Sequence, residues 1–149
     1  MCVIVDTCVA HRFFTERPPP DCKPVLDWLS CRGGGLVYRA ARDSELLQSA
    51  KARSFIAELG RQGRAFGYRD DELFDHLANL RSIRGGLRSD DAHTLALARA
   101  SGARVLCTDD DNLIADFKDK RVLNNPRGSV YSKAEHVHLL KHNGLCIGG

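Results

Sequence analysis

Acidic residues stand at four places in this sequence where their carboxylates could bind a metal ion together. Asp6 directly follows the apolar run at residues 2–5, and three consecutive aspartates follow a second run at residues 105–108. The other two places lie near the start of helical patterns, at Asp90, Asp91 and Glu45. Carboxylates that converge on one point repel one another unless a cation neutralises them. Hard divalent ions such as Mg²⁺ and Mn²⁺ prefer oxygen ligands of this kind.

A site of this kind suits the hydrolysis of phosphodiester bonds. One metal ion generates hydroxide from water and a second stabilises the leaving oxygen, with the two ions roughly 4 Å apart. The sequence contains no glycine-rich phosphate loop, GxSxG turn or GxGxxG turn that would indicate another chemistry. The acids therefore predict metal-dependent hydrolysis of a phosphodiester.

Each acid also has an explanation that needs no metal. Carboxylates in the first turn of a helix are stabilised by the helix dipole and by free backbone N–H groups, which alone would explain Asp90, Asp91 and one of the three consecutive aspartates. A solvated helix position explains Glu45 as well as a ligand role does. Asp6 is harder to explain in this way, because it follows a strand that we expect to be buried. A charge there needs a partner, such as a bound cation.

The elements that position these acids alternate along the chain between short apolar strands and amphipathic helices. We expect strands at residues 2–5, 36–38, 104–107 and near 122, and helices at about 23–31, 40–59, 70–80, 89–100 and 110–118. Ser89 is the expected N-cap of the helix that carries Asp90 and Asp91. In a parallel sheet, functional groups gather at the carboxyl ends of the strands.

This alternation predicts an α/β fold. We expect a single domain over residues 1–149, a three-layer α/β/α sandwich with a mostly parallel central sheet. A further strand and helix at about 121–149 would extend it at the C-terminal end. The composition, 43% hydrophobic and 28% charged, is that of an ordinary globular protein.

Charge, hydropathy and cysteine content indicate which partners and which cellular compartment to expect. The net charge is +3 and most basic residues are arginines, whose forked guanidinium suits phosphate groups, so a nucleic-acid partner is permitted. No apolar run approaches the length that spans a bilayer, and the first residues do not resemble a signal peptide. The six cysteines form no CxxC pair. We therefore expect a cytoplasmic protein without a membrane partner, in which all six are reduced thiols.

Three stretches of the chain resemble the ordered motifs of the PIN-domain nucleases. They read VIVDTCVAHRFF from Val3, RDSELLQ from Arg42 and SDDAHTLALARASGARVLCTDDDNLIADF from Ser89. The resemblance implies a PIN-like fold and an Mg²⁺- or Mn²⁺-dependent endoribonuclease that acts on single-stranded RNA. It places the catalytic and metal-binding acids of the family on Asp6, Glu45, Asp91 and Asp110. An antitoxin, a phage-defence role and a homo-oligomer are further partners or settings that it leaves open.

The sequence departs from the family pattern at several points. Position 8 holds Cys8, where the family often has Asn or Ser, and a thiol is a poor ligand for Mg²⁺. Asp43 is an alternative to Glu45, and Asp90 stands beside Asp91. Thr108 is expected to fix the turn before Asp110. The flanking aspartates, Asp109 and Asp111, are expected to enlarge the negative field or to cap the helix.

Two classes other than a nuclease are compatible with parts of the sequence. The alternative function is a non-catalytic nucleic-acid-binding module on the same fold, against which the full set of acids argues, because acids weaken binding to a polyanion. A phosphatase that uses the first aspartate as its nucleophile needs a second aspartate two residues later, and position 8 is Cys8.

Histidines and arginines outside the acidic motifs give weaker signals. His136, His138, His142 and Cys146 have a spacing that could hold Zn²⁺, but without a paired-cysteine knuckle the sequence favours surface histidines. His93, beside Asp91, is expected to face solvent. The basic residues that flank the loop before the acidic helix are candidates for phosphate contacts; they are Arg81, Arg84 and Arg88.

Overall fold

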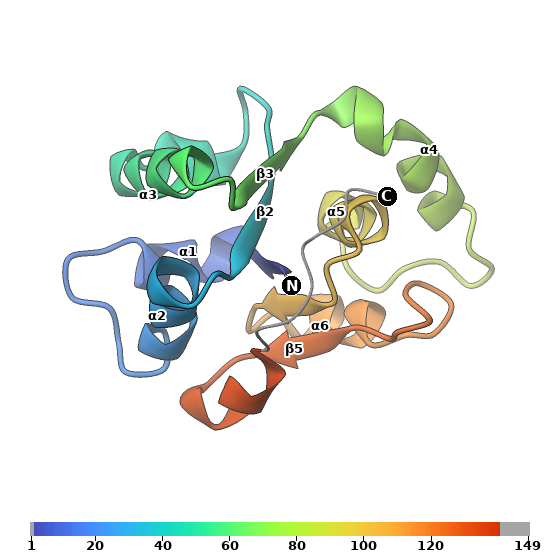
Figure 1. The fold of residues 1–149 in the computed structure, drawn as a ribbon. Helices are drawn as coiled ribbons and strands as arrows, with labels where there is room; N and C mark the ends of the chain where they lie inside the picture. The colour runs from blue at the N-terminus through green and yellow to red at the C-terminus, as the bar shows by residue number, and fades with distance from the viewer. Residues whose placement is uncertain (1, 141–149) are drawn as a thin grey trace.

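The computed structural model describes residues 2–140, which form three layers around a five-stranded parallel sheet (Figure 1). The strands are β1 (Cys2–Val5), β2 (Gly35–Arg39), β3 (Ala65–Tyr68), β4 (Val105–Cys107) and β5 (Ser129–Tyr131). Their order across the sheet is β3-β2-β1-β4-β5, and every neighbouring pair is parallel. The carboxyl ends of all five strands therefore lie at the same edge, with β1 and β4 side by side in the middle.

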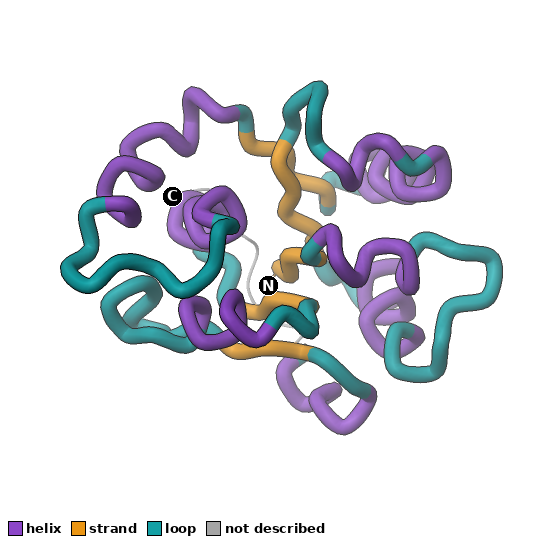
Figure 2. Tube along the Cα trace, turned by 180° about the vertical axis from the view of Figure 1, so that it is seen from behind, coloured by secondary structure: helices purple, strands orange, loops and turns teal. Residues whose placement is uncertain are grey.

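Helices cover both faces of the sheet, and the tube viewed from behind shows the same two helical layers (Figure 2). The α-helices are α1 (Thr7–Phe13), α2 (Lys23–Cys31), α3 (Ala50–Arg61), α4 (Asp70–Arg81), α5 (Ala92–Ser101) and α6 (Asp111–Phe117), and the 3₁₀ helices are η1 (Glu45–Gln48) and η2 (Ala134–Leu139). One layer holds α1, α2 and α3, and the other holds α4, α5 and α6. The predicted α/β sandwich with a parallel central sheet is confirmed.

Successive residues of β1 face opposite layers of the molecule. Val3 and Val5 pack into the core beneath α1, α2 and α3, whereas Cys2 and Ile4 pack into the core beneath α4, α5 and α6. Side chains alternate in this way along any strand. Because both faces are covered, every residue of β1 is buried, which explains its uniformly apolar sequence.

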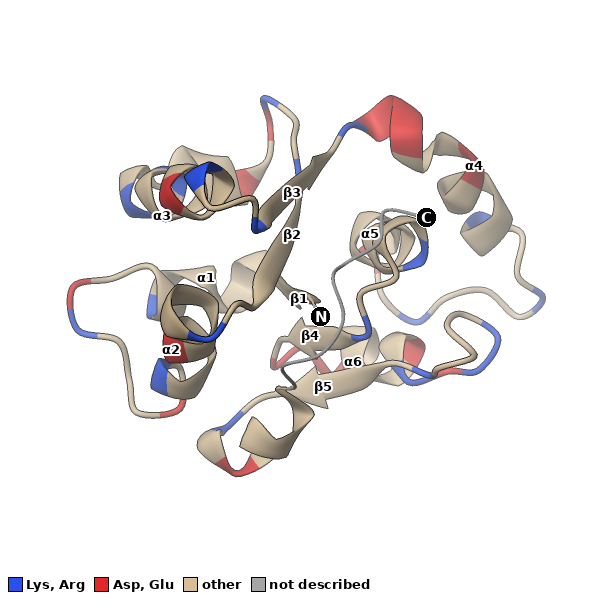
Figure 3. Cartoon of the chain, viewed as in Figure 1, with Lys and Arg blue, Asp and Glu red and all other residues tan. Residues whose placement is uncertain are grey.

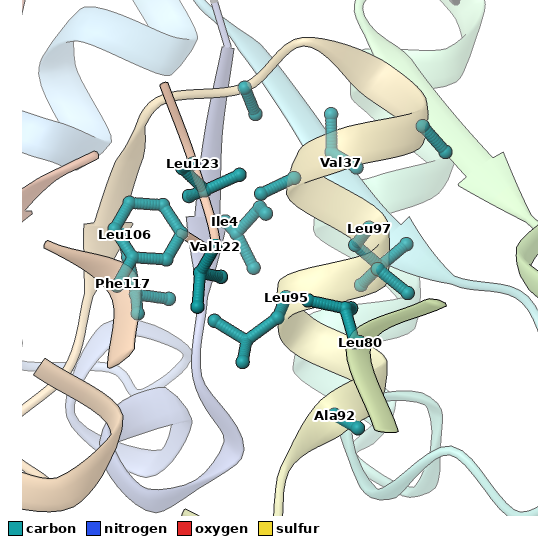
Figure 4. Close-up of a cluster of buried hydrophobic side chains, with 14 of the residues drawn as sticks. Ile4, Val37, Leu80, Ala92, Leu95, Leu97, Leu106, Phe117, Val122 and Leu123 are labelled. Carbon is teal, nitrogen blue, oxygen red and sulfur yellow. The ribbon is translucent and has the colours of Figure 1, made fainter. Parts of the chain in front are cut away.

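The core on the side of α5 is built around an almost fully buried helix. Figure 4 shows Ile4 of β1 and Leu106 of β4 in one cluster with Leu95 and Leu97 of α5. In α5 only His93 and Arg99 escape burial. The helix that follows Asp91 is thus held by packing on nearly all sides.

Three details of the predicted elements are wrong. The helix expected over residues 40–59 is two elements, because Ser49 interrupts it with extended backbone and caps α3 through the N–H of Ala52. The strand expected near Val122 is a buried turn, and the last strand is β5 instead. The N-cap of α5 is Asp91 and not Ser89, since the side chain of Asp91 accepts the N–H of Thr94.

The expectation of reduced thiols is confirmed for four of the five cysteines among residues 2–140, and Cys146 lies outside those residues. Cys8, Cys22, Cys31 and Cys107 are free thiols, whereas Cys2 is disulfide-bonded. The expectation is wrong for Cys2, because spacing along a chain does not show which cysteines a fold brings together. Among residues 2–140, no helix has the length and apolar character that a membrane crossing requires.

Candidate active site

A cavity of about 350 Å³ opens where β1 and β2 end, and acidic side chains from three segments line it. Asp6 follows β1, Glu45 begins η1 after β2, and Asp91 caps α5. These are three of the four acids predicted as ligands. The fourth, Asp110, is exposed and lies outside the lining of the cavity.

Asp6 is a buried carboxylate whose hydrogen-bond donors are neutral. It is 6% exposed, and its Oδ2 accepts hydrogen bonds from Thr108 Oγ1 at 2.7 Å and from Cys8 Sγ at 2.9 Å. Asp6 occupies the N-cap position of α1, yet its side chain does not cap the helix. No lysine, arginine or histidine of residues 2–140 forms an ion pair with it. A buried carboxylate without a cationic partner is costly, so helix capping does not explain this residue.

Thr108 links the first and the last predicted acids. Its hydroxyl donates to Asp6 and accepts the backbone N–H of Asp110 at 3.1 Å. Asp110 caps α6, because its Oδ1 accepts the N–H groups of Asn112 and Leu113 at 3.0 and 3.1 Å. Its Oδ2 has no such partner in the described structure. One hydroxyl therefore fixes the two acids relative to each other across the adjacent ends of β1 and β4.

Asp91 is held as the N-cap of α5 by a single residue. Thr94 donates its backbone N–H to Asp91 Oδ1 at 3.1 Å and its hydroxyl to Oδ2 at 2.7 Å. Each carboxylate oxygen retains a further lone pair, so the cap and a metal-ligand role are compatible. The neighbouring Asp90 is exposed and is not part of the cavity lining.

Of the two acids between β2 and α3, Asp43 lies near the guanidinium of Arg39 and Glu45 does not. This guanidinium binds Asp70 through two hydrogen bonds of 2.7 Å and lies 3.2 Å from Asp43. The hydrogen bonds from Arg39 lower the pKa of the Asp70 carboxyl. Glu45 forms no hydrogen bond or ion pair with the described residues, which leaves its carboxylate available. Figure 3 shows the acidic first turn of α4, where Asp70 lies.

Cys8 supplies a hydrogen-bond donor at the position where Asn or Ser was expected from the resemblance. Burial and the hydrogen bond to Asp6 raise the pKa of the Cys8 thiol to about 11. The group is therefore protonated at neutral pH and donates to Asp6 Oδ2, while a longer contact of 3.4 Å joins it to Asp109 Oδ1. A thiol is a weak donor, so Thr108 provides the stronger of the two bonds to Asp6.

Asp116 is a positioning residue that the sequence analysis missed. It is 3% exposed on α6, and it accepts the backbone N–H of Arg88 at Oδ1 (2.9 Å) and of Ser89 at Oδ2 (2.8 Å). These bonds tie α6 to the segment that leads into Asp91. The signal was present in the sequence: Asp116 follows Leu113 by three residues and stands next to Phe117, so it shares their buried face.

The structure also shows where the histidines and arginines outside the acidic motifs lie. His93, expected to face solvent, is half-buried and lines the cavity. In the possible zinc cluster, His136 accepts the N–H of Ser132 and His138 contacts a backbone carbonyl, while His142 and Cys146 lie outside the described residues. The three arginines before α5 are exposed, and their guanidinium groups bind no described residue; they are Arg81, Arg84 and Arg88.

The carboxylates do not form a closed ligand set. Across residues 2–140, no three His, Cys, Asp or Glu side chains are grouped so that they could hold a metal ion. The acids come from separate elements, and helix caps engage both oxygens of Asp91 and one oxygen of Asp110. The donor type nevertheless fits a hard divalent cation, because all the candidates are carboxylates. Metal binding would require these side chains to turn toward one another.

Comparison with known proteins gives one match. The family model described as PIN domain matches residues 3–120, a segment that runs from β1 past the end of α6 and contains all four predicted acids. No curated protein and no solved structure matches the chain.

Proposed function

The chain belongs to the PIN domain family, whose members are generally metal-dependent nucleases, and from this premise we propose that it is an endoribonuclease dependent on Mg²⁺ or Mn²⁺. The observation that carries the proposal is Asp6, a buried carboxylate with only neutral donors at a cavity that three further acids line, Asp43, Glu45 and Asp91. We assign Asp6, Glu45, Asp91 and Asp110 as the residues that hold the metal. The substrate that we propose is single-stranded RNA.

The bound metal would supply an activated water and charge stabilisation at the scissile phosphate. The chain contributes the placement of the ligands. Thr108 and Cys8 donate to the same oxygen of Asp6, which turns its other oxygen away from them. Arg39 lies within ion-pair distance of Asp43 and binds Asp70, whereas Glu45 forms no ion pair with the described residues, and for this reason we prefer Glu45 to Asp43 as the ligand.

We place the enzyme in the cytoplasm, where single-stranded RNA is accessible. A toxin held by an antitoxin and a phage-defence nuclease are two settings for such an activity, and either is compatible with a homo-oligomer. The alternative function, a nucleic-acid-binding module without catalysis, gains nothing from acids in its cavity, since carboxylates repel a polyanion. We therefore prefer the enzyme.

Cleavage of an end-labelled single-stranded RNA in Mn²⁺ and in EDTA tests the proposal. We expect Mn²⁺-dependent cleavage that Asp6→Asn abolishes. Asp27→Asn is the matched control, because Asp27 is an exposed acid of α2 that forms no hydrogen bond or ion pair with described residues. A DNA strand of the same sequence tests the choice of RNA. RNA binding without cleavage would support the binding module, and cleavage that survives EDTA or Asp6→Asn would refute the proposed site.

A further inference from the structure

A second cavity, of about 230 Å³, is lined by Thr108 and Asp109, which follow β4. Its floor is apolar and is formed by Val9, Phe13 and Cys107 together with the ring of Tyr131. Charged and polar groups surround this floor; they are Arg12, Asp21, Asp109 and Ser132. An apolar floor with a few polar groups at the rim is typical of a small-molecule binding site.

Hydrogen bonds join the wall of this cavity to the candidate metal ligands. Thr108 lines the cavity and donates to Asp6, and Asp109 lines it and accepts from Cys8, which also donates to Asp6. A nucleotide whose phosphate lies at Asp6 would thus have this cavity beside it. The following inference rests on the proposed nuclease function, because it assigns the cavity to part of the same substrate.

We propose that the second cavity binds a guanine base of the RNA strand next to the scissile phosphate. Guanine presents two adjacent acceptors, O6 and N7, which match the two donors of an arginine fork, and two adjacent donors, N1–H and the N2 amino group, which match a carboxylate. The rim of the cavity offers this combination, with the guanidinium of Arg12 and the carboxylates of Asp21 and Asp109. Adenine lacks the O6 acceptor, and neither pyrimidine has an N7 acceptor.

Arg12 is available for this contact although it is paired in the free protein. Its Nη2 lies 2.8 Å from Asp109 Oδ2, with side chains that are 45% and 47% exposed, and an ion pair as exposed as this is weak. Exchange of Asp109 for the guanine edge would leave the charge of Arg12 satisfied. The released Asp109 would then accept from the donor edge of the base.

Hydrogen bonds from two neighbouring residues hold the rim of the cavity at Asp21. Asp21 accepts the hydroxyl of Tyr131 at its carbonyl (2.6 Å) and the N–H of Ala134 at Oδ1 (2.9 Å). Its Oδ2 has no hydrogen-bond partner in the described structure and remains an acceptor. Tyr131 is itself buried, at 2% exposed, so it holds this rim in place against the start of η2. A pre-formed rim lowers the ordering cost of binding a base.

Cleavage of four short RNAs that differ only at one position, filled by G, A, C or U in an otherwise uniform strand, tests the inference. We expect cleavage beside G to exceed cleavage beside each other base by about tenfold, the discrimination typical of one bidentate arginine–guanine contact. Arg12→Met should reduce this ratio to about one. Arg17→Met is the matched control, because Arg17 is exposed, lies five residues after Arg12 in the loop that follows α1 and does not line the cavity.

Binding of guanosine 5′-monophosphate, measured by calorimetry on the whole chain, separates this inference from the proposed function. If no strand is cleaved but the nucleotide binds, and Arg12→Met weakens binding about tenfold while Arg17→Met does not, the base site stands and the nuclease assignment fails. If strands are cleaved with equal rates beside all four bases, or if Arg12→Met leaves both the preference and the nucleotide binding unchanged, the cavity is not a guanine site.

Discussion

Replacing Asp116 with alanine should destabilise the fold and slow cleavage together. The carboxylate accepts the backbone N–H groups of Arg88 and Ser89, and alanine leaves both without an acceptor. Hydrogen bonds to a charged group contribute about 1.5–3 kcal/mol each, but removal of a buried charge also removes its desolvation cost. We therefore expect the free energy of unfolding to fall by about 2–4 kcal/mol. The freed segment leads into Asp91, so cleavage by the folded variant should slow by about tenfold or more.

Urea unfolding measures the first effect, and cleavage rates at a temperature where the variant is fully folded measure the second. Asp116→Asn retains one acceptor oxygen and should lie between the wild-type protein and Asp116→Ala. Asp75→Ala is the control, because Asp75 is an exposed acid on α4 without a hydrogen bond or ion pair to the described residues. A loss below about 1 kcal/mol, or a normal cleavage rate in folded Asp116→Ala, would show that Asp116 does not position the segment before α5.

Three further changes test the site and its surroundings. Asp6→Asn should abolish cleavage while urea unfolding without metal shows an unchanged or higher stability, because it removes a buried charge; an unfolded variant would make Asp6 structural. Glu45→Gln should reduce the cleavage rate less than Asp110→Asn does, and titration with Mn²⁺ should show a raised metal requirement for both; an unchanged requirement in Glu45→Gln would point to a different acid. The pKa of Asp70 is lowered from 3.8 chiefly by the hydrogen bond from Arg39, so the stability from this pair is fully present above that value and is lost as the pH falls through the lowered one. Arg39→Gln should therefore lower stability slightly at neutral pH and not at all in strong acid, as urea unfolding at both pH values would reveal.

The order of the elements could be predicted because it depends on local pattern. The strand at Cys2–Val5 is apolar throughout since both of its faces are covered, and this pattern is legible in the sequence. The exact bounds could not be predicted where two local structures compete. Ser49 is compatible with a helix interior, and its role as the cap of α3 becomes visible only when its hydroxyl is seen to accept the N–H of Ala52.

The candidate site could be predicted in its residues but not in its arrangement. Asp6 and Asp91 stand out by their positions beside apolar runs, and the structure places both on one cavity. The sequence could not show whether Asp43 or Glu45 is the candidate metal ligand. This choice depends on Arg39, which forms ion pairs with Asp43 and with Asp70 of α4. Such contacts between distant segments leave no periodic trace in a sequence.

The burial of α5 makes the activity of this protein a sensitive reporter of changes far from its cavity. Ala96 and Ala98 are fully buried, so a larger side chain at either position has no free volume to occupy and must displace the helix. A displaced α5 carries Asp91 with it, since Asp91 is bonded to Thr94 in the first turn. Core substitutions that preserve folding but shift α5 should therefore change the activity. Second substitutions that restore the activity should arise in the core around α5 rather than among the acids.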